Sequence, residues 1–404
     1  MMKPLDTGER LAVVLSHPTQ YYSPWFRWLR AQTSIAFRVF YLWDFGVAKH
    51  SDPDFGTSFT WDVDLLSGYD SEFVPNASKR PGAKRFFGFN NPDLAGRLEA
   101  WRPTALLLFG YKWASHVRVI LWALRSGVPI LFRGDSHLLG RGMPPAHVRI
   151  ILRALYSRFA SFLYVGAANR EYFTALGVPD RKLFFAPHSV NGLLFNRDNP
   201  AHQEAACKLR IELGVSPSGL VVLFAGKLIA AKQPRELLEA FLDLSLPATF
   251  LVFVGEGPER EGLQALAAAR TGPGGISPVR FLPFANQSEM PSRYLLADLF
   301  VLPSRGHYET WGLAVNEAMH MGIPCMVSSL VGCQRDLVTE GETGWTFDPS
   351  VPGDLRRSLS AALAALAPAA HREEIRRGVE RRIAGYTYVQ TTSGLLAALA
   401  ALRH

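Results

Sequence analysis

The chain has 404 residues, of which 48% are apolar and 12% aromatic, so it can bury a large core and is long for one ordinary domain. Its 43 basic and 35 acidic residues give a net charge of +8, which favours anionic partners such as nucleotides and phospholipid surfaces. Nucleic acid is the less favoured anion, because no recognised RNA- or DNA-binding motif accompanies the charge.

The cysteines and the N-terminal residues indicate a cytoplasmic protein. Cys207, Cys325 and Cys333 show no metal-ligand spacing and are odd in number, which suits reduced thiols. The first ten residues are polar and mixed in charge, whereas a signal peptide is basic and then apolar. No apolar run reaches the ~18 residues of a membrane-spanning helix. We therefore expect a cytoplasmic protein and leave open a peripheral position at the inner face of the membrane.

In the first half of the chain, short apolar runs alternate with helical stretches. Strands are predicted over residues 11–16, 37–42, 105–109, 128–132 and 161–165. A helix is predicted over residues 23–31, with Ser23 as its capping residue and Pro24 at its first position.

The second half repeats this alternation after a polar helix over residues 201–213 and a turn-rich break at 216–219. Strands are predicted over residues 221–225, 249–254, 279–281, 299–302 and 325–328. The pattern predicts an α/β protein with two Rossmann-like, doubly wound parallel-sheet domains that face a central cleft. We place the domains at residues 1–205 and 206–385.

Three segments of the second half follow predicted strands and carry polar or glycine residues. Gly226, Lys227 and Lys232 follow the strand at 221–225, and Gly255 and Gly257 follow the strand at 249–254. Taken singly, the lysines also fit a solvated surface pair, and the glycines also fit a simple turn. Because ligands of open parallel sheets bind at the carboxyl ends of strands, all these residues are expected to converge.

The third segment holds two glutamates, Glu309 and Glu317, separated by seven residues across a loop-to-helix junction. A helix N-terminus suits a phosphate, because its amide groups are unpaired and carry partial positive charge. A carboxylate only accepts hydrogen bonds, so Glu317, about one turn into the helix, suits the two hydroxyls of a ribose. Glu309 in the preceding loop suits sugar hydroxyls. A solvated helix residue remains the alternative for Glu317.

With these motifs, the second half resembles the retaining GT-B glycosyltransferases of family 4, also called glycosyl transferases group 1. The family signature combines Gly-Arg-Leu and a lysine five residues after the arginine with Gly-x-Gly-Pro and Glu-x7-Glu. Here they stand as Gly226-Lys227-Leu228 with Lys232, Gly255 to Pro258, and Glu309 to Glu317, and the match covers about residues 219–350. Lys227 replaces the usual arginine, so it brings charge without a bidentate fork.

The resemblance implies that the chain binds an NDP-sugar donor and transfers the sugar to an acceptor hydroxyl with retention of configuration. We expect no metal or cofactor, because no Asp-x-Asp stands at a useful strand end and the lysines can neutralise the phosphate. The acceptor is a sugar, a lipid-linked glycan or a small molecule, as in cell-envelope or polysaccharide biosynthesis. A closing helix at about residues 386–404 returns to the first domain. Glu309, Lys232 and His137 are the implied catalytic residues. The implied donor-binding residues are Gly226, Lys227, Lys232, Gly255, Gly257, Glu309, Gly312, Leu313, Ala314 and Glu317.

The acceptor side is expected in the first half of the chain. The segment from Ser16 to Pro24 resembles a subset of the family with a His-Pro-x-Gln-Tyr start, so His17, Gln20 and Tyr21 are candidates. A helix-entry turn explains Ser23 and Pro24 without function. The remaining candidates, each with local packing as its alternative, follow two further strands and are Tyr111, Asp135 and His137.

Two other features leave alternatives open. The segment from His147 to Arg158 has the pattern of a basic amphipathic helix, which suits an anionic membrane surface or a solvated face. The two-domain architecture also suits a nucleotide-sugar epimerase or a noncatalytic partner protein. A glycosidase with Glu309 and Glu317 as acid and base is a poorer account, because one of these carboxylates is placed for ribose.

Overall fold

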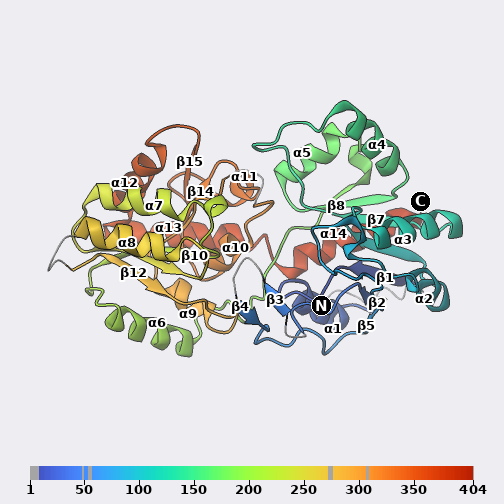
Figure 1. The fold of residues 1–404 in the computed structure, drawn as a ribbon, viewed down its shortest axis with the longest axis horizontal. Coiled ribbons are helices and arrows are strands. Elements are labelled where there is room, and N and C mark those ends of the chain that lie inside the picture. Colours follow the sequence, from blue (N-terminus) through green and yellow to red (C-terminus); the bar gives the residue numbers. More distant parts are fainter. Residues whose placement is uncertain (1–8, 48–49, 53–56, 272–275, 306–308, 404) are drawn as a thin grey trace.

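The computed structural model of the protein describes residues 9–47, 50–52, 57–271, 276–305 and 309–403. Residues 1–8, on which the expectation about a signal peptide depends, lie outside this part of the chain. Two parallel sheets, each covered by helices, form two α/β units that lie side by side (Figure 1). The predicted pair of parallel-sheet domains is therefore confirmed.

The first sheet has seven strands in the order β5-β2-β1-β6-β7-β8-β9. Its inner strands are almost fully buried apolar runs, as parallel strands covered on both faces must be. Its strands are β1 (Arg10–Leu15), β2 (Ala36–Tyr41), β5 (Ser71–Phe73), β6 (Ala105–Phe109), β7 (Ile130–Arg133), β8 (Ser161–Tyr164) and β9 (Leu183–Phe185). The short strands β3 (His50–Asp52) and β4 (Thr57–Phe59) pair antiparallel outside it. The helices of this unit are α1 (Tyr22–Gln32), α2 (Leu94–Trp101), α3 (Ala114–Ser126), α4 (Ala146–Ser157) and α5 (Ala167–Ala175).

The second sheet has six strands in the order β12-β11-β10-β13-β14-β15. Its strands are β10 (Leu220–Ala225), β11 (Thr249–Val254), β12 (Val279–Leu282), β13 (Leu299–Leu302), β14 (Cys325–Ser328) and β15 (Gly344–Phe347). The helices of this unit are α6 (Pro200–Glu212), α7 (Pro234–Leu244), α8 (Arg260–Thr271), α9 (Met290–Leu295), α10 (Leu313–His320), α11 (Gln334–Leu337), α12 (Asp354–Leu366) and α13 (Ala369–Ile383).

The last helix, α14 (Tyr388–Ala400), packs against the first unit although it follows the second in sequence (Figure 1). Its Leu395 and Leu399 are buried in the same apolar cluster as the strands β1 and β2. The Trp25 indole N–H donates to Thr392 Oγ1 at 3.0 Å, which ties α14 to α1. The chain thus crosses between the two units twice, before α6 and after α13.

The prediction that Ser23 caps the first helix is wrong. The helix begins at Tyr22, and the Tyr22 backbone N–H donates to Thr19 Oγ1 at 3.2 Å. Tyr21 already has helical backbone angles, so Ser23 falls inside the first turn. There it is buried, and its hydroxyl accepts a hydrogen bond from the Tyr69 hydroxyl at 3.2 Å.

Among the described residues, no helix combines the length and the apolar character that crossing a membrane requires.

All three cysteines are free thiols; Cys325 and Cys333 are buried in the second unit and Cys207 is exposed on α6.

Candidate active site

A cavity of about 370 Å³ lies between the two units, at the carboxyl ends of strands from both sheets. We call it the donor cavity. The predicted strand-end segments of the second half all contribute to it, as the rule for open parallel sheets requires. Its lining comprises Gln20, Tyr21, Trp61, Asp135, Ala225, Gly226, Lys227, Lys232, Val254, Gly255, Phe284, Ala285, Gln287, Met290, Tyr294, Glu309, Thr310, Trp311, Gly312, Leu313, Ala314 and Glu317.

Lys232 and Glu309 meet directly at the wall of the donor cavity. A short 3-10 turn over Ala230–Lys232 places the lysine, whose Nζ donates to Glu309 Oε2 at 2.7 Å. Ser304 Oγ donates to the same carboxylate oxygen at 3.2 Å. Both side chains of the ion pair are largely buried, with 12% and 18% exposed. The pair therefore holds one cation and one carboxylate in a fixed orientation beside the space that a ligand would fill.

The loops after β10 and β11 pack backbone against backbone, which explains why they are rich in glycine. Gly255 has φ +141°, and a Cβ atom there would lie 2.0 Å from the carbonyl oxygen of Gly226. A Cβ atom on Gly257 would lie 2.4 Å from the carbonyl oxygen of Leu228. Gly226 and Gly255 line the donor cavity, whereas Gly257 does not. The structure thus gives Gly257 a packing position, and its predicted contact with the donor remains a prediction.

The N-terminus of α10 opens into the donor cavity. Gly312 precedes the helix with φ +102°, and a Cβ atom there would lie 2.9 Å from Leu302 and 3.0 Å from Val331. This left-handed turn lets the chain enter the helix between two apolar side chains. Gly312, Leu313 and Ala314 line the cavity, so the first-turn amide groups and the positive end of the helix dipole lie at its wall.

Glu317 lies one turn further along α10 and is only 3% exposed. Its Oε2 accepts a hydrogen bond from the Tyr294 hydroxyl at 2.7 Å, and its Oε1 accepts one from Gln287 Nε2 at 3.3 Å. Burial raises the pKa of the Glu317 carboxyl, while the hydrogen bonds from Tyr294, Gln287 and Tyr21 oppose that rise. A carboxylate offers about four acceptor positions, so these three donors orient Glu317 and leave about one position for a ligand hydroxyl.

Asp135 lies where the donor cavity meets a second cavity of about 290 Å³, which we call the acceptor cavity. Asp135 Oδ2 accepts from Thr310 Oγ1 at 2.8 Å and lies 3.7 Å from His188 Nε2. Burial alone would raise the pKa of Asp135, but the contacts with His188 and Thr310 outweigh it and lower the pKa to about 2. Asp135 is therefore a carboxylate at neutral pH.

The acceptor cavity is rich in aromatic side chains and includes the predicted Tyr111. Its lining is Tyr22, Phe109, Gly110, Tyr111, Lys112, Trp113, Phe132, Arg133, Gly134, Asp135, Ser136, Val165 and His188. One lining residue that was not predicted from the sequence is His188, which is buried and packs on Trp311 with ring centroids 5.6 Å apart. Its only signal was its place shortly after β9, a strand that the sequence did not predict.

The two predicted histidines lie outside the linings of both cavities. His17 packs edge-on against Phe45 at 5.3 Å, its Nδ1 is 3.0 Å from Ser16 Oγ, and burial lowers its pKa to about 4. His137 accepts from the Leu139 N–H at Nδ1 and lies 3.3 Å from the Glu309 carbonyl oxygen through Nε2. These contacts match the local-packing alternative for His137, and its catalytic role remains a prediction.

Comparison with known proteins decides the family of the second unit. Residues 208–377 match the family model described as glycosyl transferases group 1. The second half of the chain therefore contains a glycosyl transferases group 1 domain. This group 1 domain contains Lys227, Lys232, Glu309 and Glu317, the four charged residues that sequence analysis assigned to donor binding.

Relatives of the chain include D-inositol 3-phosphate glycosyltransferases. The protein of that name from Geodermatophilus obscurus is 30% identical over 240 residues, which are 57% of this chain and 50% of the relative. The one from Actinosynnema mirum is 27% identical over 366 residues, which are 81% of this chain and 84% of the relative. The chain thus spans about half the length of the first relative and most of the second.

Solved structures show the same fold beyond the group 1 domain. Anabaena Alr3699/HepE, solved in complex with UDP and glucose, superposes with a TM-score of 0.71 at 15% identity. The superposition covers 97% of this chain and 100% of that chain, so both units and their connections are shared. The architecture is GT-B, as the resemblance implied.

Proposed function

We propose that the protein is a retaining, metal-independent glycosyltransferase of family 4 that transfers a sugar from an NDP-sugar to an acceptor hydroxyl. The observation that carries this proposal is the shared lining of the donor cavity by Lys232, Glu309, Glu317 and the N-terminus of α10. The UDP and glucose bound to Alr3699/HepE, a protein of the same fold, support a UDP-sugar as the first donor to test.

In this proposal the donor lies along α10. A ribose hydroxyl donates to Glu317, and the diphosphate accepts from the α10 amide groups with Lys227 and Lys232 beside it. The sugar that is transferred lies at Glu309. Tyr294 and Gln287, which also line the cavity, orient Glu317 through their hydrogen bonds to it. The anomeric carbon would then face Asp135, at the junction with the acceptor cavity.

The reaction breaks the bond between the anomeric carbon and the diphosphate oxygen and forms one to the acceptor oxygen on the same face. Lys232 and the helix dipole stabilise the charge that develops on the leaving diphosphate, and that oxygen takes the proton of the acceptor hydroxyl. Asp135, held ionised, accepts a hydrogen bond from an acceptor hydroxyl and orients it. Preorganised cations at the phosphate replace the metal ion that other transferases use.

The stereochemistry of the product tests this function. With an α-configured NDP-sugar and a panel of sugar, lipid-linked and small-molecule acceptors, we expect an α-linked product by NMR spectroscopy, at the same rate with and without a metal chelator. A β-linked product would contradict retention. Release of a free epimerised sugar from donor alone would instead identify an epimerase, and an intact donor with every acceptor would favour a noncatalytic partner protein.

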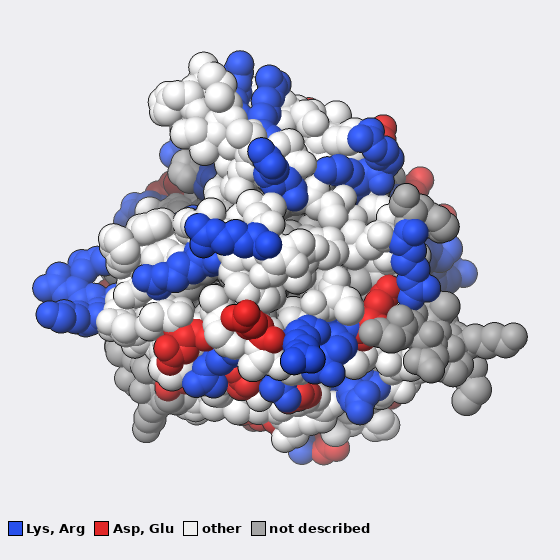
Figure 2. Space-filling model, turned by 90° about the vertical axis from the view of Figure 1, so that its right-hand side faces the viewer, with Lys and Arg blue, Asp and Glu red and all other residues white. Residues whose placement is uncertain are grey.

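We further propose that the first unit binds an anionic membrane surface from the cytoplasmic side. On α4, Leu152 and Tyr156 are buried, whereas Ile150 and Ile151 are 69% and 64% exposed beside the exposed Arg153. A second exposed group combines Lys84 and Arg85 with the following two phenylalanines. Figure 2 shows basic side chains spread over the face that carries α3, with acidic side chains gathered in its lower part.

Substituting the exposed isoleucines of α4 distinguishes a membrane-binding helix face from a solvated one. Replacing both Ile150 and Ile151 by Glu should weaken binding to vesicles that contain phosphatidylglycerol by about tenfold or more, because apolar burial in the bilayer is lost and negative charge repels the lipid. Cosedimentation measures this affinity. The matched control Ile211→Glu, at a residue 78% exposed on α6 of the other unit, should bind like the unmodified protein. Equal binding by all three proteins would show that α4 is a solvated face.

A further inference from the structure

A third cavity, of about 530 Å³, lies at the opposite end of the second sheet from the donor cavity. Its floor is formed by the turns that precede β13 and β14, and its sides by α6 and α13. It shares no lining residue with the donor cavity. Its lining comprises Arg197, Gln203, Ala206, Cys207, Arg210, Leu295, Ala297, Asp298, Gly322, Ile323, Pro324, Leu366, Ala369, Arg372, Glu373 and Arg376.

Four guanidinium groups line this cavity against two carboxylates, Asp298 and Glu373. Asp298 already has two hydrogen-bond donors within the protein: its Oδ2 accepts from the Val221 N–H at 2.9 Å and from Arg210 at 3.4 Å. Arg210 is further held by the carbonyl oxygen of Gly219. Arg372 reaches Asp298 only at 4.0 Å, at the limit of an ion pair. One of the two carboxylates is therefore largely used by the protein itself.

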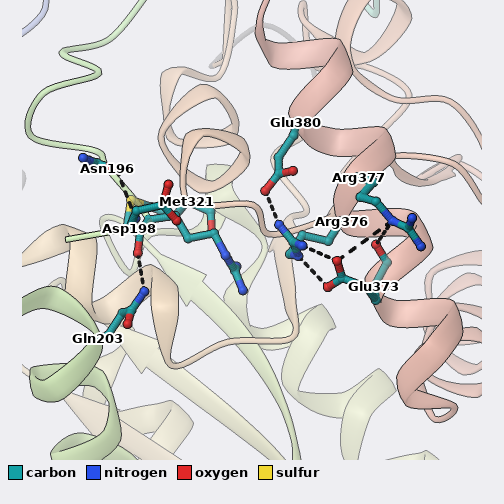
Figure 3. Close-up of polar contacts among 9 residues, drawn as sticks. Asn196, Asp198, Gln203, Met321, Glu373, Arg376, Arg377 and Glu380 are labelled. Atoms are coloured by element: carbon teal, nitrogen blue, oxygen red, sulfur yellow. Dashed lines mark hydrogen bonds and ion pairs between the residues drawn. The ribbon is translucent and has the colours of Figure 1, made fainter. Parts of the chain in front are cut away.

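The second carboxylate is also occupied. Figure 3 shows Arg376 bound between Glu373 and Glu380 on α13, with Arg377 bonded to Glu373 as well. The loop that carries Asn196 and Asp198 lies across from this helix in the same view. The cavity therefore lies between a helix whose carboxylates are engaged and a loop that adds one more cation.

That cation is Arg197, which is only partly exposed. Its Nη1 donates to the Met321 carbonyl oxygen at 3.2 Å, and no carboxylate of the described residues lies within 4.0 Å of its guanidinium group. Burial lowers the pKa of Arg197 and the neighbouring Arg376 lowers it further, whereas the carboxylates of Glu380, Glu373 and Asp198 raise it. A guanidinium group carries five N–H donors, so Arg197, with its hydrogen bond to Met321, retains donors for an anion. Arg197 and Arg372 are thus the two cations of the cavity with unused capacity for an anion.

The remaining lining residues indicate the chemistry of the uncharged part of such an anionic ligand. Ala206, Leu295, Ile323, Pro324 and Leu366 give the cavity an apolar wall. A volume of about 530 Å³ falls within the ~300–1,000 Å³ of small-molecule sites and exceeds the needs of inorganic phosphate alone. We propose that this cavity binds a phosphorylated small molecule, with its phosphate on Arg197 and Arg372 and its apolar part against this wall.

Titration with phenyl phosphate, which joins a phosphate to an apolar ring, tests the proposal. We expect calorimetry to show binding to the unmodified protein, tighter than that of inorganic phosphate because the ring adds apolar burial. Arg197→Gln and Arg372→Gln should each weaken the affinity by about tenfold or more, as loss of a charge-assisted hydrogen bond does. Arg372→Lys should lose less, since it keeps the charge.

Two control variants separate this site from its surroundings. Arg377→Gln removes a guanidinium group from the same helix but outside the lining, and should leave the affinity unchanged. Lys232→Gln alters the donor cavity and should also leave it unchanged. Binding that survives Arg197→Gln and Arg372→Gln, or that Lys232→Gln abolishes, would overturn the proposal, and so would the absence of binding to the unmodified protein. Thermal melts verify that each variant is folded.

Discussion

Replacing Glu309 by Gln should lower the rate of sugar transfer by about 10²–10³-fold, the loss typical for removing one preorganised charged group from an active site. The carboxylate accepts from Lys232 at 2.7 Å and from Ser304 at 3.2 Å, and in our proposal it also holds the donor sugar. Glutamine keeps the shape but loses the charge and one acceptor oxygen. Steady-state kinetics with saturating donor measures the loss as a fall in kcat.

An ion pair elsewhere in the chain provides a matched control for Glu309→Gln. Glu171 pairs with Arg335 at 2.7 Å across the two units, the same length as the pair of Glu309 with Lys232, but it lines neither cavity. Glu171→Gln should retain full activity. If Glu309→Gln were equally active while melting at the same temperature, Glu309 would have no role in transfer.

Lys232→Gln should have an effect of similar size, but through the leaving group. The loss of its charge removes stabilisation of the departing diphosphate, so kcat should fall by about 10²–10³-fold. Donor affinity should fall as well, because the phosphate already carries negative charge in the bound donor. The Lys232 side chain is only 12% exposed, so water screens its charge little.

Lys208→Gln is the control for Lys232→Gln. Lys208 forms a Lys-Glu pair with Glu204 at the same 2.7 Å, but its side chain is 67% exposed on α6. This surface pair contributes little to stability, so the variant should keep both kcat and donor affinity. Equal behaviour of Lys232→Gln and Lys208→Gln would mean that the diphosphate does not lie at Lys232.

The strands β10, β11, β13 and β14 were predictable from sequence because they are continuous apolar runs buried on both faces. The strands that escaped prediction within the two sheets are β5, β9 and β15, which have three or four residues each and lie at sheet edges. An edge strand pairs with one neighbour and requires no long apolar run, so its sequence carries little signal. The convergence of the three strand-end segments followed from the rule for parallel sheets.

The partners of the site residues could not be predicted in the same way. Tyr294 on α9 and Gln287 after β12 reach Glu317 from 23 and 30 residues away in sequence. His188 follows β9 and meets Asp135, which follows β7, at the same edge of the sheet with β8 between the two strands. No local pattern encodes such contacts, because they depend on how separate strand ends are brought together. Gly257 shows the reverse, since its motif fits donor binding while its backbone packs on Leu228.

Calorimetric titration with UDP-, GDP-, ADP- and TDP-sugars tests the central claim, donor binding at the cavity beside α10, most directly. One nucleotide class should bind the unmodified protein with one site per chain. Glu317→Gln should weaken it by about tenfold or more, because the ribose loses a charged acceptor. Failure of every nucleotide sugar to bind, or equal affinity in Glu317→Gln, would contradict the claim.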